Sequence, residues 1–308
     1  VAFATGASAQ TYKMTTPFSS GVAVPDKIES SIGTLNLNYG YPSADTVEKI
    51  YDNLDFQRAV QGYLLGLPAV NQLANRTNIL KMGPANTTVP IWEDLVDSRT
   101  IELTANNNTP YTWFWLDLRQ GPLVLEVPPK VLGLIDDMWY RWTVDVGITG
   151  PDKGAGGKYL LLPPGYKDAV PDGYHVVRSP TYQTWAGWRT FLVDGDAKPG
   201  VAAVKQYTKI YPLAQAGKPP PALTFVNMSG KPFNMVAPAD ESFWPMLHQV
   251  VQEEPTDTID ATTLAIWASI GIEKGKPFSP DSRMKNILAE AAAVGDATGR
   301  ALGYRTRD

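Results

Sequence analysis

Residues 109–118, TPYTWFWLDL, alternate between two sets of side chains, which is the pattern of a β-strand. One face of this strand carries Tyr111, Trp113, Trp115 and Asp117, and the other carries Thr112, Phe114, Leu116 and Leu118. The period of two continues to about residue 215, so the middle of the chain is predicted to be rich in β-strands.

Further short strands surround this one. Residues 122–129, PLVLEVPP, end in a pair of prolines, and residues 136–148, DDMWYRWTVDVGI, alternate over nine positions and predict one long strand. The chain holds 26 Gly and 26 Pro, mostly in short clusters that mark turns. Regular turns between short strands predict a β-sandwich over residues 90–225.

Helical periodicity flanks this β-rich region. Apolar residues recur every three or four positions from Val47 to Leu64, and Pro68 is expected to end or kink that helix before a second one at 69–81. Residues 43–89 are thus predicted to be a helical segment packed on the sandwich. Residues 10–42 are predicted to be an extended arm, and 226–308 a small helical domain whose last helix starts with Ser279 as cap and Pro280 at its first position. The predicted fold class is mainly β with α.

The first residues indicate export. Residues 1–9 end in Ala7-Ser8-Ala9, a small-x-small pattern typical of the end of a secretory signal, which predicts a periplasmic or secreted protein. No later apolar run reaches the roughly 20 residues that span a bilayer, so no membrane span is expected.

Composition limits the chemistry. The 308 residues carry a net charge of −4 without a stripe of Lys or Arg, which argues against nucleic acid as a partner. The chain has no Cys and two His, so no cofactor and no zinc site are expected. A Ca²⁺ ion at the acidic turns is the one cation that the sequence leaves open.

The aromatic residues give the main candidate for a binding site. Rings with polar tips beside guanidinium groups suit a sugar or an aromatic small molecule. The candidate ligand-binding residues are Asn106, Asn108, Thr109, Tyr111, Trp113, Trp115, Trp139 and Arg189. The alternative stays open that these rings are core, either between two sheets or against the helices.

Asp137, Arg141 and Asp145 are the candidate catalytic residues, because they share one polar face of the predicted strand 136–148. Asp137 and Asp145 are eight residues apart, or about 26 Å along a strand, so they are not expected to work as a pair with each other. Either could act with Arg141 or with a neighbouring strand. The alternative is a structural ion pair across the sheet.

Three groups of motifs carry a family resemblance. They are LTANNNTPYTWFWLDLRQGPLVLEVPP (103–129), DDMWYRWTVDVGITGPDKGAGGKYLLLPPGY (136–166), and VNMSGKPFN, VVQEEP and GIEKGKPFSPDSRMKNIL between 226 and 288. From about residue 30 to 308 the chain resembles the bacterial family called domain of unknown function 1254. The family pattern at the first motif reads Asn-x-Asp-Thr-x-Tyr, and Asn108 stands where Asp is common.

The resemblance implies an exported protein with an immunoglobulin-like β-sandwich followed by a small helical domain. Members usually continue into a second β domain, domain of unknown function 1214, which is expected as a partner either in cis or as a separate chain. The family has no activity that can be carried over.

Three functions remain open. The first is an exported protein that binds a sugar or an aromatic small molecule. The second is a carboxylate-dependent hydrolase or lyase whose site needs the absent C-terminal domain. The third is a structural surface protein that forms homo-oligomers through its aromatic faces.

Overall fold

The computed structural model describes residues 19, 21, 22 and 24–305. The predicted signal remnant at 1–9 therefore lies outside the described residues, as does the start of the predicted arm. The chain divides into two compact units, residues 1–54 and 55–308, which are described separately.

The first unit contains a three-stranded antiparallel sheet where an extended arm was expected. Its strands are β1 (Lys27–Ser30), β2 (Gly33–Asn38) and β3 (Tyr41–Pro42). The unit also holds the first residues of α1 (Ala44–Leu80). The Asn36 backbone N–H donates to the Thr46 hydroxyl at 2.9 Å, which joins the start of the helix to β2.

Helix α1 is continuous through Pro68, so the predicted second helix at 69–81 is wrong. Proline has no N–H to donate to the carbonyl of Leu64 and usually breaks a helix interior. Here the flanking side chains Tyr63, Ala69 and Val70 are all buried. Because tertiary packing supplies most of the stability of a protein helix, this burial explains why the helix continues.

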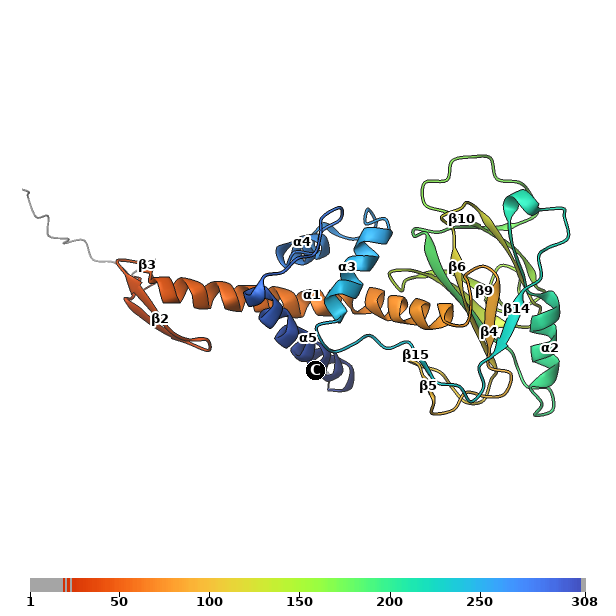
Figure 1. Ribbon diagram of the computed structural model, residues 1–308, viewed down its shortest axis with the longest axis horizontal. Coiled ribbons are helices and arrows are strands. Elements are labelled where there is room, and N and C mark those ends of the chain that lie inside the picture. The colour runs from red at the N-terminus through yellow and green to blue at the C-terminus, as the bar shows by residue number, and fades with distance from the viewer. Residues whose placement is uncertain (1–18, 20, 23, 306–308) are drawn as a thin grey trace, which may run out of the picture. The chain divides into compact units, whose positions relative to one another are not determined.

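Two larger sheets make up the β part of the second unit (Figure 1). The six-stranded sheet has the order β14 (Thr224–Asn227), β4 (Thr88–Ile91), β6 (Tyr111–Asp117), β12 (Gln183–Arg189), β8 (Leu132–Asp137) and β9 (Trp142–Gly147). The four-stranded sheet has the order β11 (His175–Arg178), β10 (Gly157–Leu162), β7 (Leu123–Val127) and β13 (Lys209–Pro212). A third, two-stranded sheet pairs β5 (Thr100–Ile101) with β15 (Phe233–Asn234).

The two larger sheets share one hydrophobic cluster. Phe114 and Leu116 of β6 contribute to it from the six-stranded sheet, and Leu125 of β7 and Leu161 of β10 contribute from the four-stranded sheet. Helix α2 (Lys198–Tyr207) adds Val201 and Val204. One of the two predicted faces of strand 109–118 is therefore core.

The opposite face of the six-stranded sheet is covered by helices. Helices α3 (Phe243–Glu253), α4 (Ala261–Ser269) and α5 (Ser282–Tyr304) gather around α1 in this unit (Figure 1). Their buried residues form one cluster with Trp113, Trp115 and Trp185 of the sheet. We call this side of the sheet the helix-covered face. Helix α5 begins after Asp281, which caps it through the N–H of Met284, and not at the predicted Ser279.

The described residues are about 33% helical and 25% strand, so the fold is mixed α/β and not mainly β. The additional helix comes from α1 and α5, which have 37 and 23 residues. Strand pairing is also mixed, because β14/β4 and β10/β11 are parallel while the other pairs in these two sheets are antiparallel. The immunoglobulin-like arrangement stays a prediction.

Residues 136–148 do not form the single long strand that their alternation predicts. They end β8, turn at 138–141 and continue as β9, antiparallel to β8. Tyr140 takes a left-handed backbone conformation in this turn, with φ of 61°. The sequence marks the turn poorly, because such a φ is usually supplied by Gly, Asn or Asp.

Candidate functional site

Strand register brings distant residues together on the helix-covered face. Two adjacent rows cross the sheet from β6 through β12 and β8 to β9. The first row is Trp113, Gly187, Leu134 and Asp145, and the second is Tyr111, Arg189, Leu132 and Gly147. Directly opposed residues in antiparallel strands point to the same side of a sheet. Four residues that the sequence singled out therefore share one surface: Tyr111, Trp113, Asp145 and Arg189.

A cavity of about 280 Å³ lies over these two rows. Its strand residues include Tyr111, Trp113, Leu132, Leu134, Asp145, Trp185, Gly187 and Arg189, and its loop residues are Glu102, Thr104 and Thr149. We call this cavity the pocket. Its volume is near the lower end of the range for small-molecule sites, which favours a ligand of modest size.

Gly187 makes room for the indole rings that line the pocket. A Cβ atom placed on this residue would come within 2.7 Å of Cδ1 of Trp113 and 3.2 Å of Cζ2 of Trp185. The indole rings therefore occupy the space above the glycine that a side chain would take.

The pocket carries charges of both signs. Glu102 and Asp145 are both among its lining residues, and Arg189 contributes a guanidinium group. Asp145 accepts a hydrogen bond from Nε1 of Trp142 at 2.9 Å, and Glu102 accepts one from the backbone N–H of Thr104 at 2.8 Å. Among the residues that the structure describes, Arg189 has no carboxylate within 4 Å and no hydrogen-bond acceptor.

Burial changes the acidity of the groups around the pocket. Burial raises the pKa of Glu102. It also raises the pKa of Asp136 to about 7, and the like charges of Asp137 and Asp145 add to the increase. Asp136 lies on the helix-covered face in the row after Leu134 and Asp145, and it is 6% exposed. No described donor hydrogen-bonds to its carboxyl group.

Tyr140 connects these acids. Burial raises its phenol pKa, and the charges of Glu102 and Asp136 raise it further, so all three groups are electrostatic neighbours. Its ring packs edge-on against Trp185 with centroids 6.1 Å apart. The turn at 138–141 thus places a phenol between the acids and an indole that lines the pocket.

The asparagine loop positions Tyr111. The side-chain oxygen Oδ1 of Asn106 accepts from the Asn108 N–H at 3.1 Å and from the Thr109 hydroxyl at 2.9 Å, while Nδ2 of Asn106 donates to the Tyr111 hydroxyl at 3.0 Å. Asn106, Thr109 and Tyr111 are the residues that match the family pattern, so the described contacts give this pattern a structural role. Asn108 itself is exposed.

Asp137 and Arg141 form an ion pair that stabilises the 138–141 turn, and neither residue lines the pocket. Asp137 is 1% exposed and accepts from the N–H groups of Trp139 and Arg141, both at 2.9 Å, and from Nε of Arg141 at 2.8 Å. Arg141 also donates to the carbonyl and the hydroxyl of Thr258. These contacts correspond to the structural ion pair that the sequence left open, although it lies within a turn and not across strands.

The expected 26 Å between Asp137 and Asp145 is also wrong, because the two residues lie on paired strands of the β8–β9 hairpin. The hairpin brings Asp136 close enough to Asp145 for its charge to raise the Asp136 pKa. Asp136, which the sequence did not single out, is therefore the acid on this face whose pKa is raised to about 7.

Trp115 and Trp139 are core residues away from the pocket. Trp115 is fully buried and donates from Nε1 to Gln183 at 2.6 Å. Trp139 is 5% exposed and stacks on Trp267 of α4 at 6.1 Å. Trp113 is 3% exposed as well and packs on Trp92 with ring centroids 4.2 Å apart, so these three predicted rings do not form an open stacking surface.

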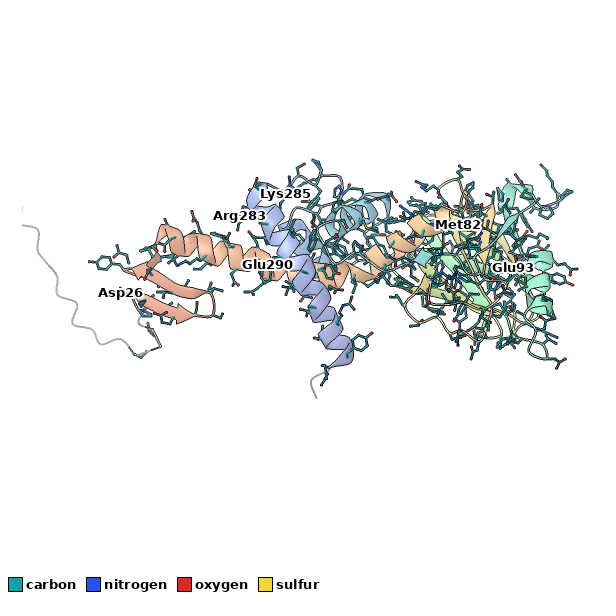
Figure 2. All side chains as sticks on the ribbon, turned by 60° about the horizontal axis from the view of Figure 1, so that its bottom comes forward. Asp26, Met82, Glu93, Arg283, Lys285 and Glu290 are labelled. Atoms are coloured by element: carbon teal, nitrogen blue, oxygen red, sulfur yellow. The ribbon has the colours of Figure 1, made fainter. Side chains whose placement is uncertain are left out.

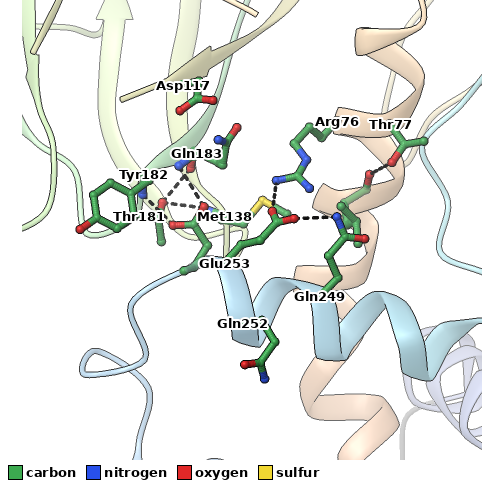
Figure 3. A network of polar contacts seen from close by, with 12 residues as sticks. Arg76, Thr77, Asp117, Met138, Thr181, Tyr182, Gln183, Gln249, Gln252 and Glu253 are labelled. Atoms are coloured by element: carbon green, nitrogen blue, oxygen red, sulfur yellow. Dashed lines mark hydrogen bonds and ion pairs between the residues drawn. The ribbon is translucent and has the colours of Figure 1, made fainter. Parts of the chain in front are cut away.

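A polar network joins the helices to β12, one of the strands under the pocket (Figure 3). Arg76 of α1 donates to Glu253 at 2.6 Å, and Glu254, which is fully buried, accepts from the backbone N–H groups of Tyr182 and Gln183 at 2.6 and 3.0 Å. Burial raises the pKa of Glu254 to about 7. The start of β12 is thereby held by the end of α3.

Three other hollows are larger but are lined by fewer charged groups. The first, of about 550 Å³, includes Asp117 and Tyr211, the second, of about 490 Å³, lies between α3 and α5 and includes Glu241 and Lys285, and the third, of about 360 Å³, includes Lys130. Figure 2 labels Lys285 near the beginning of α5. None of these includes a residue that was predicted to bind ligand. A further hollow of about 280 Å³ beside α4 includes Trp139 and Arg141, whereas the pocket includes Tyr111, Trp113 and Arg189 and is therefore the better candidate.

Within the described part of the chain, no group of three or more His, Asp or Glu side chains could hold a metal ion. The Ca²⁺ interpretation therefore lacks a candidate site there. No described helix is long and apolar enough to cross a membrane.

Sequence reasoning missed Glu102, Leu134, Asp136 and Gly187. A usable signal existed for Gly187, because a glycine inside a strand often marks a close approach of another group. Glu102 gave no signal, since it lies in a loop that reaches the pocket through the fold.

Comparisons with known proteins identify the domain but not its activity. No curated protein matches the chain. The VPA0106 protein from Vibrio parahaemolyticus has a similar structure, with a TM-score of 0.55 and 20% identity over 80% of this chain and 59% of that chain. The chain thus spans less than two thirds of that protein's length.

An uncharacterised protein from Burkholderia cenocepacia is 13% identical over 56% of this chain and 51% of that chain, with a TM-score of 0.26. Residues 86–212 match the family model described as Protein of unknown function (DUF1254), which confirms the resemblance drawn from the motifs. The similarity to the family DUF1254 thus covers residues 86–212 of this chain.

Proposed function

We propose that this chain is an exported binding protein that holds a small organic molecule, a sugar or an aromatic compound, in the pocket. The main observation behind this proposal is that aromatic rings, two carboxylates and one guanidinium line the same cavity. The guanidinium has no described partner. Pockets that combine apolar walls with a few charged groups are typical of small-molecule sites.

The proposal extends to the surroundings of this site. The shared cluster between the two larger sheets supports the immunoglobulin-like sandwich that the resemblance implies. A second β domain, in cis or as a separate chain, would be a partner of this unit. Export rests on residues 1–9 alone.

Two probes test the binding function: methyl β-D-glucopyranoside for a sugar and 2-phenylethanol for an aromatic compound. We expect ligand-observed NMR to detect binding of at least one of them. Thr149→Trp, at an exposed pocket position, should weaken that binding at least tenfold by narrowing the cavity, since most of the surface of a bound ligand must be enclosed.

Thr262→Trp is the matched control, because Thr262 is an exposed residue of α4 outside the pocket lining. It should leave probe binding unchanged. Failure of both probes to bind, or equal binding by the two tryptophan variants, would count against the proposal.

A carboxylate-dependent hydrolase or lyase is the second candidate. It is favoured by Asp136, whose pKa of about 7 suits a group that exchanges a proton at neutral pH beside the second carboxylate Asp145. With p-nitrophenyl glycosides as probes, turnover should show an apparent pKa near 7 that Asp136→Asn removes. An Asp136→Asn variant with the same rate and pH profile would exclude this role.

A further inference from the structure

We propose that the pocket selects a zwitterion of the α-amino-acid class, with its carboxylate at Arg189, its ammonium group at Asp145 and Glu102, and an apolar side chain against the indoles. This inference rests on the proposed binding function. It adds the charge pattern of the ligand, which neither the family model nor the similar structures supply.

The arginine determines one end of the ligand. Arg189 is half-buried at the second row of the pocket, and no described acceptor or carboxylate contacts its guanidinium. A guanidinium held in a partly dry site binds best to a planar anion, which it can contact through two parallel hydrogen bonds. A ligand carboxylate has that geometry.

The acids determine the other end. Asp145 accepts a single described hydrogen bond, from Trp142, so its carboxylate retains capacity for further donors. Glu102 accepts from the backbone N–H of Thr104 and interacts with the backbone N–H groups of Leu103 and Ala105, and it contributes its negative charge to the pocket lining. Asp136 adds a third acid in the next row of the same face, without a described hydrogen bond. An ammonium group offers three donors and one positive charge, and it therefore suits this side of the pocket.

The spacing keeps the two ends apart. Arg189 is on β12 and Asp145 on β9, with β8 between them, which separates the strands by roughly 10 Å. Their rows are offset by two residues, or roughly 7 Å along the strands. Opposite charges that do not neutralise each other within the pocket leave room for a ligand that bridges them.

The walls accept an apolar group. Trp113 and Trp185 bring indole rings to the pocket, and Leu134 lies between the acidic and basic corners in the same row as Asp145. A cavity of about 280 Å³ favours a single amino acid over a peptide or an oligosaccharide.

Four probes with one phenylethyl frame test the charge pattern at pH 7.5 by isothermal titration calorimetry. They are L-phenylalanine, phenethylamine, 3-phenylpropanoate and 2-phenylethanol. We expect L-phenylalanine to bind at least tenfold more tightly than either singly charged probe, with 2-phenylethanol weakest. Equal or tighter binding of a singly charged probe or of 2-phenylethanol would overturn the inference.

Two variants test which pocket residue binds the carboxylate and which binds the ammonium group of the ligand. Arg189→Gln should weaken L-phenylalanine at least tenfold and leave phenethylamine within about twofold, whereas Asp145→Asn should weaken L-phenylalanine and leave 3-phenylpropanoate nearly unchanged. If both variants bind L-phenylalanine as tightly as wild type, the assignment is wrong. The wild-type probe series decides the charge preference even if a variant does not fold.

The outcomes separate this inference from the function beneath it. Binding of 2-phenylethanol or of the methyl glucoside that Thr149→Trp weakens, together with no preference for L-phenylalanine, would retain a binding protein and reject the zwitterion. Absence of binding by every probe would reject both.

Discussion

Asp137→Ala is expected to lower the free energy of unfolding by about 3 to 5 kcal/mol. The carboxylate is 1% exposed and accepts from two backbone N–H groups and from Nε of Arg141. Alanine would leave these donors in the 138–141 turn without an acceptor. Chemical denaturation at pH 5 is the suitable measurement, because Asp136 is then largely protonated and relief of its repulsion with Asp137 contributes little.

Asp168→Ala is the control for this variant, since Asp168 is exposed, and it should change stability by less than about 0.5 kcal/mol. Arg141→Met should cost less than Asp137→Ala, because the Arg141 side chain is 41% exposed and Asp137 would keep its two backbone donors. A small cost for Asp137→Ala combined with loss of probe binding would instead favour a direct role in the site.

Asp136→Asn is expected to stabilise the protein at pH 8 relative to wild type, by on the order of 3 kcal/mol, and to leave it nearly unchanged at pH 4. The folded protein holds the Asp136 proton up to a pKa of about 7, whereas the unfolded chain releases it near 3.8. The contribution of this group to stability is therefore complete below about pH 4 and is lost as the pH rises through 7. Asparagine has a similar shape and no charge to bury.

The difference in unfolding free energy between wild type and variant, measured at several pH values, isolates this effect. Glu254, whose pKa is also raised to about 7, changes stability in the same direction and remains in both proteins. Asp168→Asn should show no such pH-dependent difference. A constant difference between wild type and Asp136→Asn from pH 4 to pH 8 would show that Asp136 has an ordinary acidity in the folded state.

Alternation along residues 109–118 was sufficient to assign both faces of β6 correctly. It did not show what covers each face. Trp113 and Trp115 pack in one cluster with residues of α3, α4 and α5, more than 100 positions later in the chain. Periodicity within one segment carries no information about such distant partners, so buried and ligand-facing rings could not be separated.

The β8–β9 hairpin was missed for a different reason. Its turn uses Tyr140 at φ 61° and is stabilised by Asp137, so the usual Gly, Pro or Asn signals are lacking. Treating 136–148 as one strand placed Asp137 and Asp145 far apart and overlooked Asp136. Even so, Tyr111, Trp113, Asp145 and Arg189 were chosen for their chemistry, and register brought them to one pocket.

The contacts that complete the strands depend on chain that is synthesised much later. Arg141 in the β8–β9 turn donates to Thr258, 117 residues further on, and the backbone at the start of β12 donates to Glu254, about 70 residues further on. On a ribosome, neither contact can form until the residues after α3 have left the exit tunnel. Long-range contacts of this kind slow folding and leave partly formed sheets exposed. The nascent sheet therefore lacks α3, α4 and α5, whose residues cluster with its indoles, until the last part of the chain has been synthesised.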